Sequence, residues 1–241
     1  MKDIFFRNEF IWLAYVLVNY IFILLAYKRW GKLGLMIFVP LSVVIANIQV
    51  NKLIVLFGIE ATMGNIAYAS ISTIEDILSE NYGKKYAKTV VSIGFVTMIF
   101  TTLVMNIAIL MNPASFDTIQ PALKALFTPL FRLTIASLTA YVASTYLDIY
   151  LYQAIRKVFP SFKNIWIRNN LSTFLSQLLD SIVFTTIAFL GVFDMSTLIQ
   201  IVISTYLIKV IVSVLDTPFV YIAAWWKKQG KIREIDEIQE G

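Results

Sequence analysis

The sequence alternates between long apolar segments and short polar or charged connections. A helix needs about 20 mostly apolar residues to cross a bilayer. Segments 10–27, 33–51 and 89–111 meet this requirement without a charged residue. Four more segments are long enough if internal charges are allowed: 61–79, 126–155, 171–193 and 195–226. The pattern predicts an all-α integral membrane protein with seven transmembrane helices in one domain, 1–226, followed by a polar, frayed cytoplasmic tail at 227–241.

The distribution of lysine and arginine among the connections predicts the orientation. Cytoplasmic loops of membrane proteins carry an excess of these residues. With seven spans, fourteen of them fall on one side and four on the other, while Arg132 and Lys209 lie inside helices. The richer side holds the connections 28–32, 84–88 and 156–168 and the C-terminal tail. We therefore expect the N-terminus outside the cell, the C-terminus inside, and a location in the plasma membrane.

The composition narrows the possible functions. The chain is 59% hydrophobic and 15% charged, whereas a soluble domain is about 45–50% apolar and about 25% charged. It has no cysteine and no histidine, which excludes disulfides, thiolate nucleophiles and the usual zinc sites. The net charge of +5 is explained by the cytoplasmic loops. We expect no enzyme activity, no metal, no cofactor and no nucleic-acid partner.

Seven charged residues fall within the predicted helices. A charge in hydrocarbon costs about 2.5–3.5 kcal/mol on insertion scales, so it is retained where it is paired, faces water or has a function. Residues three, four and seven apart share a helix face, and these charges lie on faces of small and polar residues that we expect to point into the bundle. They are Glu75, Asp76, Arg132, Asp148, Asp180, Lys209 and Asp216.

The depth of these charges predicts a polar cavity that extends from the midplane to the cytoplasmic side. At 1.5 Å per residue, Asp180 and Lys209 lie near the middle of their helices and the other acids nearer the cytoplasmic ends. Cations, polyamines, protons or a planar molecule with N–H donors would all suit an acidic cavity. Alternatively, Lys209 pairs with Asp180 or Asp216 and only fixes helix packing. Glu80, Lys84 and Lys85 are expected to be loop residues.

Several segments resemble the queuosine precursor transporter family of bacteria and archaea. They occur in family order and cover most of the chain from residue 46 onward. The longest are EDILSENYGKKYAKTVVSIGF (75–95) and WIRNNLSTFLSQLLDSIVFTTIAF (166–189). The family is itself similar to the substrate-binding subunits of vitamin uptake systems, which have a six-helix core. This resemblance implies that 33–226 forms the core and that helix 10–27 is an N-terminal addition.

The resemblance implies uptake of a 7-deazaguanine precursor of queuosine, either 7-cyano-7-deazaguanine or its aminomethyl relative, by a carrier. Three family acids correspond to Asp76, Asp148 and Asp180, and the family lysine to Lys209. Aromatic rings would stack on the base, and amides would add hydrogen bonds. We expect the substrate site to comprise Asn47, Asn65, Tyr68, Glu75, Asp76, Asp148, Gln177, Asp180 and Lys209.

The chain departs from the family pattern at Glu75 and Thr145, where Thr and Gln are common, and this can change which deazaguanine is preferred. Three alternatives stay open: a substrate-binding subunit that needs an energising partner, an intramembrane enzyme with paired carboxylates, and a purely structural bundle. The chain has no P-loop, so it lacks that means of using ATP. Proton coupling and facilitated diffusion are both compatible with the sequence.

Overall fold

The computed structural model describes residues 2–49, 52–56, 59–128 and 131–234, and most of them are helical. Within this part of the chain, four helical segments are long and apolar enough to cross a bilayer. They are Asn8–Gln49, Lys84–Leu110, Phe162–Phe189 and Met195–Lys228. The fold therefore agrees with the predicted helical membrane protein.

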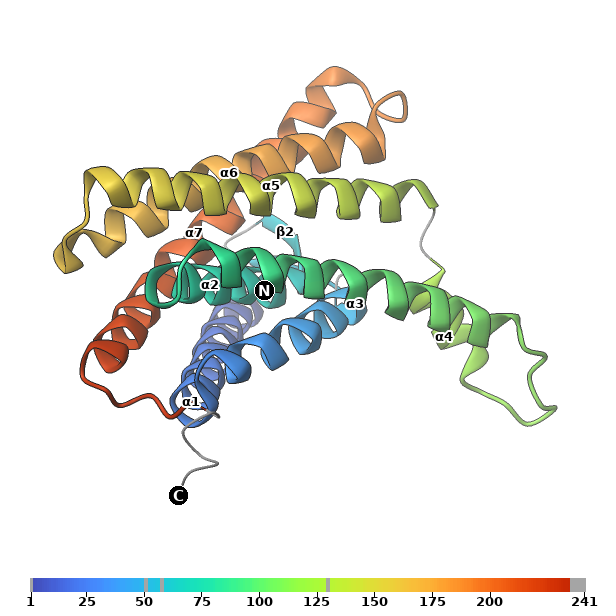
Figure 1. Cartoon of the computed structure of the whole chain (residues 1–241). Coiled ribbons are helices and arrows are strands. Elements are labelled where there is room, and N and C mark those ends of the chain that lie inside the picture. Colours follow the sequence, from blue (N-terminus) through green and yellow to red (C-terminus); the bar gives the residue numbers. More distant parts are fainter. Residues whose placement is uncertain (1, 50–51, 57–58, 129–130, 235–241) are drawn as a thin grey trace.

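The first helix, α1 (Lys2–Gln49), consists of two helical arms that meet at a sharp turn (Figure 1). The turn is at Gly31, whose φ of 56° and ψ of −138° favour a residue without a side chain. The arms pack closely, because a Cβ at Gly34 would run into the backbone of the preceding arm. Far from the turn, the Tyr15 hydroxyl donates a hydrogen bond to Gln49 Oε1 at 2.9 Å. The two arms correspond to the first two predicted helices.

A short antiparallel hairpin precedes the next helix. Strand β1 (Leu53–Leu56) pairs with β2 (Ile59–Thr62), and helix α2 then runs Gly64–Asn81. The prediction that a helix begins at residue 61 was wrong. A short apolar run does not distinguish a strand from a helix by its periodicity, and the β-branched pair Ile54 and Val55 favours an extended chain.

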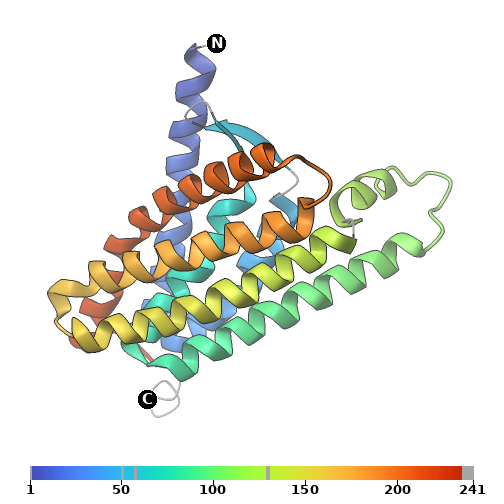
Figure 2. The same cartoon turned by 90° about the horizontal axis from the view of Figure 1, so that it is seen from above.

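Four long helices lie side by side in the order α3, α5, α6 and α7 (Figure 2). Two predicted boundaries among them need correction. The expected helix 126–155 begins later, as α5 at Phe131, and residues 126 and 127 end a separate short helix, α4. The expected helix 171–193 begins earlier, at Ile165. The bounds are α3 Lys84–Leu110, α4 Gln120–Phe127, α5 Phe131–Val158, a 3₁₀ turn η1 Phe162–Asn164, α6 Ile165–Phe189 and α7 Met195–Lys228.

Helix α2 lies at the centre of the molecule, where it packs against α1, α3, α5 and α7. All its residues from 70 to 79 are buried. A helix buried on every side is normally apolar on every side, yet this one carries Thr73, Glu75 and Asp76 in its buried part. The centre of the fold is therefore polar, and these side chains define the region where a site can form.

The segment that follows α7 folds back onto the turn of α1. Ile232 is only 7% exposed, and the carboxylate of Glu234 lies against Gly31. The prediction of a frayed tail was therefore wrong for the residues up to 234. Glu234 accepts hydrogen bonds from the Lys32 N–H (3.2 Å), from Lys227 Nζ (2.8 Å) and from the Tyr82 hydroxyl.

Candidate functional site

Four buried carboxylates lie on α2 and on two helices that pack against it, α5 and α7. Glu75 and Asp76 come from α2, Asp148 from α5 and Asp216 from α7, and each side chain is at most 2% exposed. Asp148 is close enough to interact electrostatically with each of the other three. We call these four residues the acidic cluster.

Helical spacing explains how these side chains reach the interior. About one turn before Asp76, Asp148 and Asp216, each helix carries a serine on the same face, and all three serines are buried. Small residues allow neighbouring helices to approach closely. The prediction that these polar faces point into the bundle is confirmed. The serines are Ser72, Ser144 and Ser213.

Asp216 accepts hydrogen bonds from two helices. The Thr73 hydroxyl of α2 donates to its Oδ2 at 2.9 Å, and Asn169 Nδ2 of α6 donates to its Oδ1 at 2.9 Å. The Tyr20 hydroxyl of α1 lies beside Thr73 and Asp216. This hydroxyl is buried and has no hydrogen-bond partner among the described residues. It therefore leaves a polar group at the cluster available for another molecule.

Asp148 is bonded on one side only. The Ser176 hydroxyl of α6 donates to Asp148 Oδ1 at 3.0 Å, while Oδ2 has no partner within the described parts of the chain. The same is true of Asp76 Oδ2 and Glu75 Oε1. Buried polar atoms usually have partners, so three oxygens of the cluster are able to accept hydrogen bonds from a ligand.

Asp180 and Lys209 form an ion pair between α6 and α7. The Ser144 hydroxyl of α5 donates to Asp180 Oδ1 at 3.2 Å, so the pair joins three helices. Its side chains are 15% and 18% exposed, which makes them more accessible than the acidic cluster. The pairing of Lys209 with Asp180 was one of two pairings that the sequence left open.

The remaining predicted site residues are less informative. Asn47 Nδ2 donates to the Val43 carbonyl of its own helix at 2.9 Å, and Gln177 is partly buried on α6. The side chains of Asn65 and Tyr68 lie outside the described residues. The role of all nine predicted residues in substrate binding stays a prediction.

A second charged network lies next to the cluster and was not predicted. Arg168 of α6 is fully buried and holds Glu80 of α2 with two hydrogen bonds, of 2.8 and 2.6 Å. The Tyr152 hydroxyl also donates to Glu80 at 3.0 Å. The prediction that Arg168 and Glu80 lie in loops is wrong, because Arg168 belongs to α6 and Glu80 to α2. Each residue provides the charge that makes the burial of the other tolerable.

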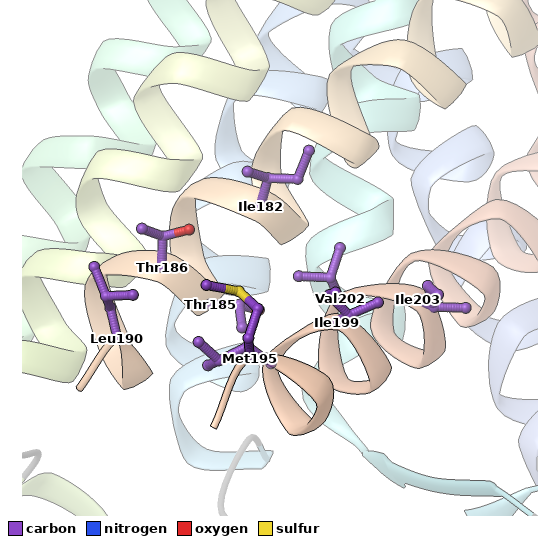
Figure 3. Close-up of a pocket in the computed structure, with 9 residues that line it drawn as sticks. Ile182, Thr185, Thr186, Leu190, Met195, Ile199, Val202 and Ile203 are labelled. Carbon is purple, nitrogen blue, oxygen red and sulfur yellow. The ribbon is translucent and has the colours of Figure 1, made fainter. Parts of the chain in front are cut away.

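The structure also has an apolar cavity of about 350 Å³ between the end of α6 and the start of α7 (Figure 3). Apolar side chains and two threonines surround it, and Ile182, Leu190 and Met195 lie among them. None of the predicted site residues whose side chains the structure describes lines it. It is therefore not the acidic cavity expected from the sequence, whose carboxylates are enclosed.

The sequence pattern did not predict several residues of the site. Asn169 lies within the RNN part of segment 166–189, and Thr73 lies one turn before Asp76, so both had a signal that pointed to the cluster. Asp216 was recognised as an intramembrane charge but was not included in the site. Tyr20 had no signal, because the predicted helix 10–27 has no charged residue and its arm of α1 contacts the cluster only after folding.

Comparison with known proteins places the chain in a group of transporters. The family model described as "Putative vitamin uptake transporter" matches residues 62–223. A curated relative from Bacillus subtilis (strain 168), named "Probable queuosine precursor transporter", is 43% identical over 218 residues, which covers 90% of this chain and 95% of the relative. No solved structure matches the chain.

Proposed function

Because the chain belongs to the vitamin uptake transporter family, a group of multi-pass transporters of the plasma membrane, we propose that it imports a 7-deazaguanine precursor of queuosine into the cytoplasm. The observation that carries this proposal is the 43% identity, over 90% of the chain, to a relative named for queuosine precursor transport. The substrate is 7-cyano-7-deazaguanine or its aminomethyl relative. A carrier moves it without altering it chemically.

The chemistry of the acidic cluster supports a ligand of this class. A guanine-type base has an N–H and an adjacent amino group on one edge, and a single carboxylate accepts from both. Asp76 Oδ2 and Asp148 Oδ2 lack donors within the described parts of the chain. We assign the base edge to these two acids, with Glu75 beside them, and the remaining polar contacts of the base to Asn47 and Gln177.

Access to this site requires movement of the helices. The four acids are at most 2% exposed, so a base as large as a deazaguanine reaches them only when the surrounding helices separate. We propose that the bundle opens alternately to the two sides of the membrane, as other carriers do. The ion pair between Asp180 and Lys209 is more exposed and joins α6 to α7, which suits a contact that breaks and re-forms during opening.

The proposed topology has seven spans, with the N-terminus outside and the C-terminus inside. The two arms of α1 provide two spans, and α2, α3, α5, α6 and α7 provide five. Helix α2 has only 18 residues, and its acids reduce its hydropathy. Because it is buried among other helices, its polar groups meet protein rather than lipid.

Binding of 7-cyano-7-deazaguanine to the purified protein tests the proposed site. Asp148→Asn removes the charge but retains the shape of the side chain. A hydrogen bond to a charged group contributes about 1.5–3 kcal/mol, so we expect the dissociation constant to rise at least roughly tenfold. Asp117→Asn is the matched control, because Asp117 is exposed and uses one oxygen, which asparagine keeps, to accept from the Ile119 N–H. Equal affinity in both variants would exclude Asp148 from the site.

Uptake into vesicles that contain this chain alone distinguishes a carrier from a substrate-binding subunit. A carrier accumulates or equilibrates labelled substrate without another protein, whereas a subunit binds it but does not transport it. Recovery of chemically unchanged substrate from the vesicles separates both from an intramembrane enzyme.

A further inference from the structure

We infer that the acidic cluster holds protons when the bundle is closed, and that these protons cross the membrane with the substrate. The inference rests on the proposed function for the substrate, and on the geometry of Glu75, Asp76, Asp148 and Asp216 for the protons. It assigns the transporter a driving force, the proton gradient, that neither its family nor its relative's name specifies.

The acidic cluster has few hydrogen-bond donors for its eight carboxylate oxygens. Among the described residues, three side chains donate hydrogen bonds to the cluster, Thr73 and Asn169 to Asp216 and Ser176 to Asp148, and the hydroxyls of Ser172 and Thr173 also lie near Asp148. Three carboxylate oxygens have no partner among the described residues, on Glu75, Asp76 and Asp148. An ionised carboxylate in a water-free interior needs donors on both oxygens. A carboxylic acid needs fewer, and its own O–H can donate to the next acid.

Positive charge is also scarce around the cluster. Arg168 is held by Glu80, and Lys209 is held by Asp180. Helix α3 has no charged residue after Lys88, and α1 contributes the neutral Tyr20 next to Asp216. The titratable and charged groups that surround the cluster are Tyr20 from α1, Glu80 from α2, Tyr152 from α5 and Arg168 from α6.

The free-energy cost of burying charge favours protonated acids over ionised ones in this cluster. Burying an unpaired charge costs several kcal/mol even after the protein relaxes, and four neighbouring negative charges also repel one another. A carboxyl group in such a place takes up a proton instead of remaining charged. A shared metal ion fits less well, because within the described residues no three acidic side chains are arranged to hold one.

The buried Tyr20 hydroxyl is an independent observation that points to exchange with a small molecule at the cluster. It lies beside Thr73 and Asp216 and has no partner among the described residues. A hydroxyl group both donates and accepts a hydrogen bond. Tyr20 therefore suits a water molecule that carries protons to and from Asp216 when the bundle opens.

The coupling of proton movement to substrate transport follows from the enclosure of the acids in the closed bundle. The acids are enclosed, so the bundle closes readily only when they are neutral or are bonded to substrate. When the bundle opens towards the acidic, outer side, the acids that do not bind the base edge load with protons. When it opens towards the cytoplasm, substrate and protons leave. Each import cycle then moves protons inward.

Infrared spectroscopy of the purified full-length protein tests the protonation without any substrate. Protonated carboxyl groups give a carbonyl band that is distinct from that of carboxylates and that shifts in D₂O. We expect this band at neutral pH in the wild type, a weaker band in Asp76→Asn and in Asp148→Asn, and an unchanged band in Asp117→Asn. Absence of the band from the wild type would overturn the inference, whatever the stability of the variants.

Transport into vesicles tests the coupling. With labelled 7-cyano-7-deazaguanine outside and a pH-sensitive dye inside, an acidic outer medium should raise the initial rate of uptake several-fold over equal pH. The lumen should acidify as substrate enters. Uptake that ignores the pH gradient, or that follows a sodium gradient instead, would overturn only the coupling. Absence of uptake under every gradient would overturn the proposed function and the coupling together.

Discussion

Replacement of the buried Arg168 by methionine gives the sharpest test of how the charges of this fold stabilise it. The guanidinium is 0% exposed. It donates to Glu80 at 2.8 and 2.6 Å, and to the carbonyls of Phe159 and Ser161 at 2.9 Å each. It therefore joins α2 to the connection between α5 and α6. Methionine fills a similar volume but leaves the Glu80 carboxylate, whose side chain is 10% exposed, without its main partner.

The expected loss of stability comes from the stranded charge. Breaking a buried ion pair by removing one partner costs about 3–5 kcal/mol. Arg156 Nη1 lies 3.8 Å from Glu80 and retains part of the attraction, so we expect a loss of about 3 kcal/mol. For a chain of this size, 1 kcal/mol lowers the melting temperature by roughly 2–4 °C. The variant should therefore melt about 6–12 °C below the wild type.

Thermal unfolding in one detergent, followed by tryptophan fluorescence, measures this difference. Lys163→Met is the control, because Lys163 is an exposed basic residue of the same connection, and its loss should change the stability by less than about 0.5 kcal/mol. The double variant Arg168→Met with Glu80→Gln removes the stranded charge and should recover about half of the loss. A melting temperature equal to that of Lys163→Met, or a double variant no more stable than the single one, would refute the reasoning.

Three further changes test other parts of the fold. Gly31→Ala should lower the melting temperature by at least roughly 2–8 °C, because a positive φ, here 56°, costs other residues about 1–2 kcal/mol and the added Cβ would also collide with the Glu234 carboxylate. Normal stability would show that the turn rearranges freely. Desolvation alone would raise the pKa of Glu234, but hydrogen bonds from Lys227, Tyr82 and the Lys32 N–H together lower it. Its ionised form therefore stabilises the fold at neutral pH, and this stabilisation is lost as the pH falls below about 4.5, the ordinary value. Glu234→Gln should accordingly melt earlier than the wild type at pH 7 but equally at low pH, and a difference that persists in acid would contradict the role of its charge. Lys209→Met should cost about 1–3 kcal/mol by leaving Asp180 unpaired, and chemical denaturation should show most of this loss restored by a second change, Asp180→Asn.

The local sequence predicted the type of most elements. Charge-free apolar runs of helical length identified both arms of α1 and most of α3, because such runs are stable in a bilayer only as helices. Errors occurred where an apolar run is short. The hairpin Leu53–Thr62 was missed, since periodicity over so few residues does not separate strand from helix.

Helical spacing also predicted which faces of the helices are buried. The polar faces that lead to Asp76, Asp148 and Asp216 point inward, as expected for residues that lipid would not tolerate. Spacing within one helix gives no information about its rotation relative to its neighbours. For that reason the contact of Tyr20 with the acidic cluster was not foreseen.

What the sequence alone determined is therefore the membrane-spanning helical class, the family resemblance and the set of acids available for a site. The tertiary structure decided which charges meet: Lys209 with Asp180, Arg168 with Glu80, and Glu234 with the turn at Gly31. The physical reason is that hydropathy and periodicity act within a segment, whereas ion pairs and hydrogen bonds require atoms of different helices to lie within a few ångströms. Only the packing of the helices fixes those distances.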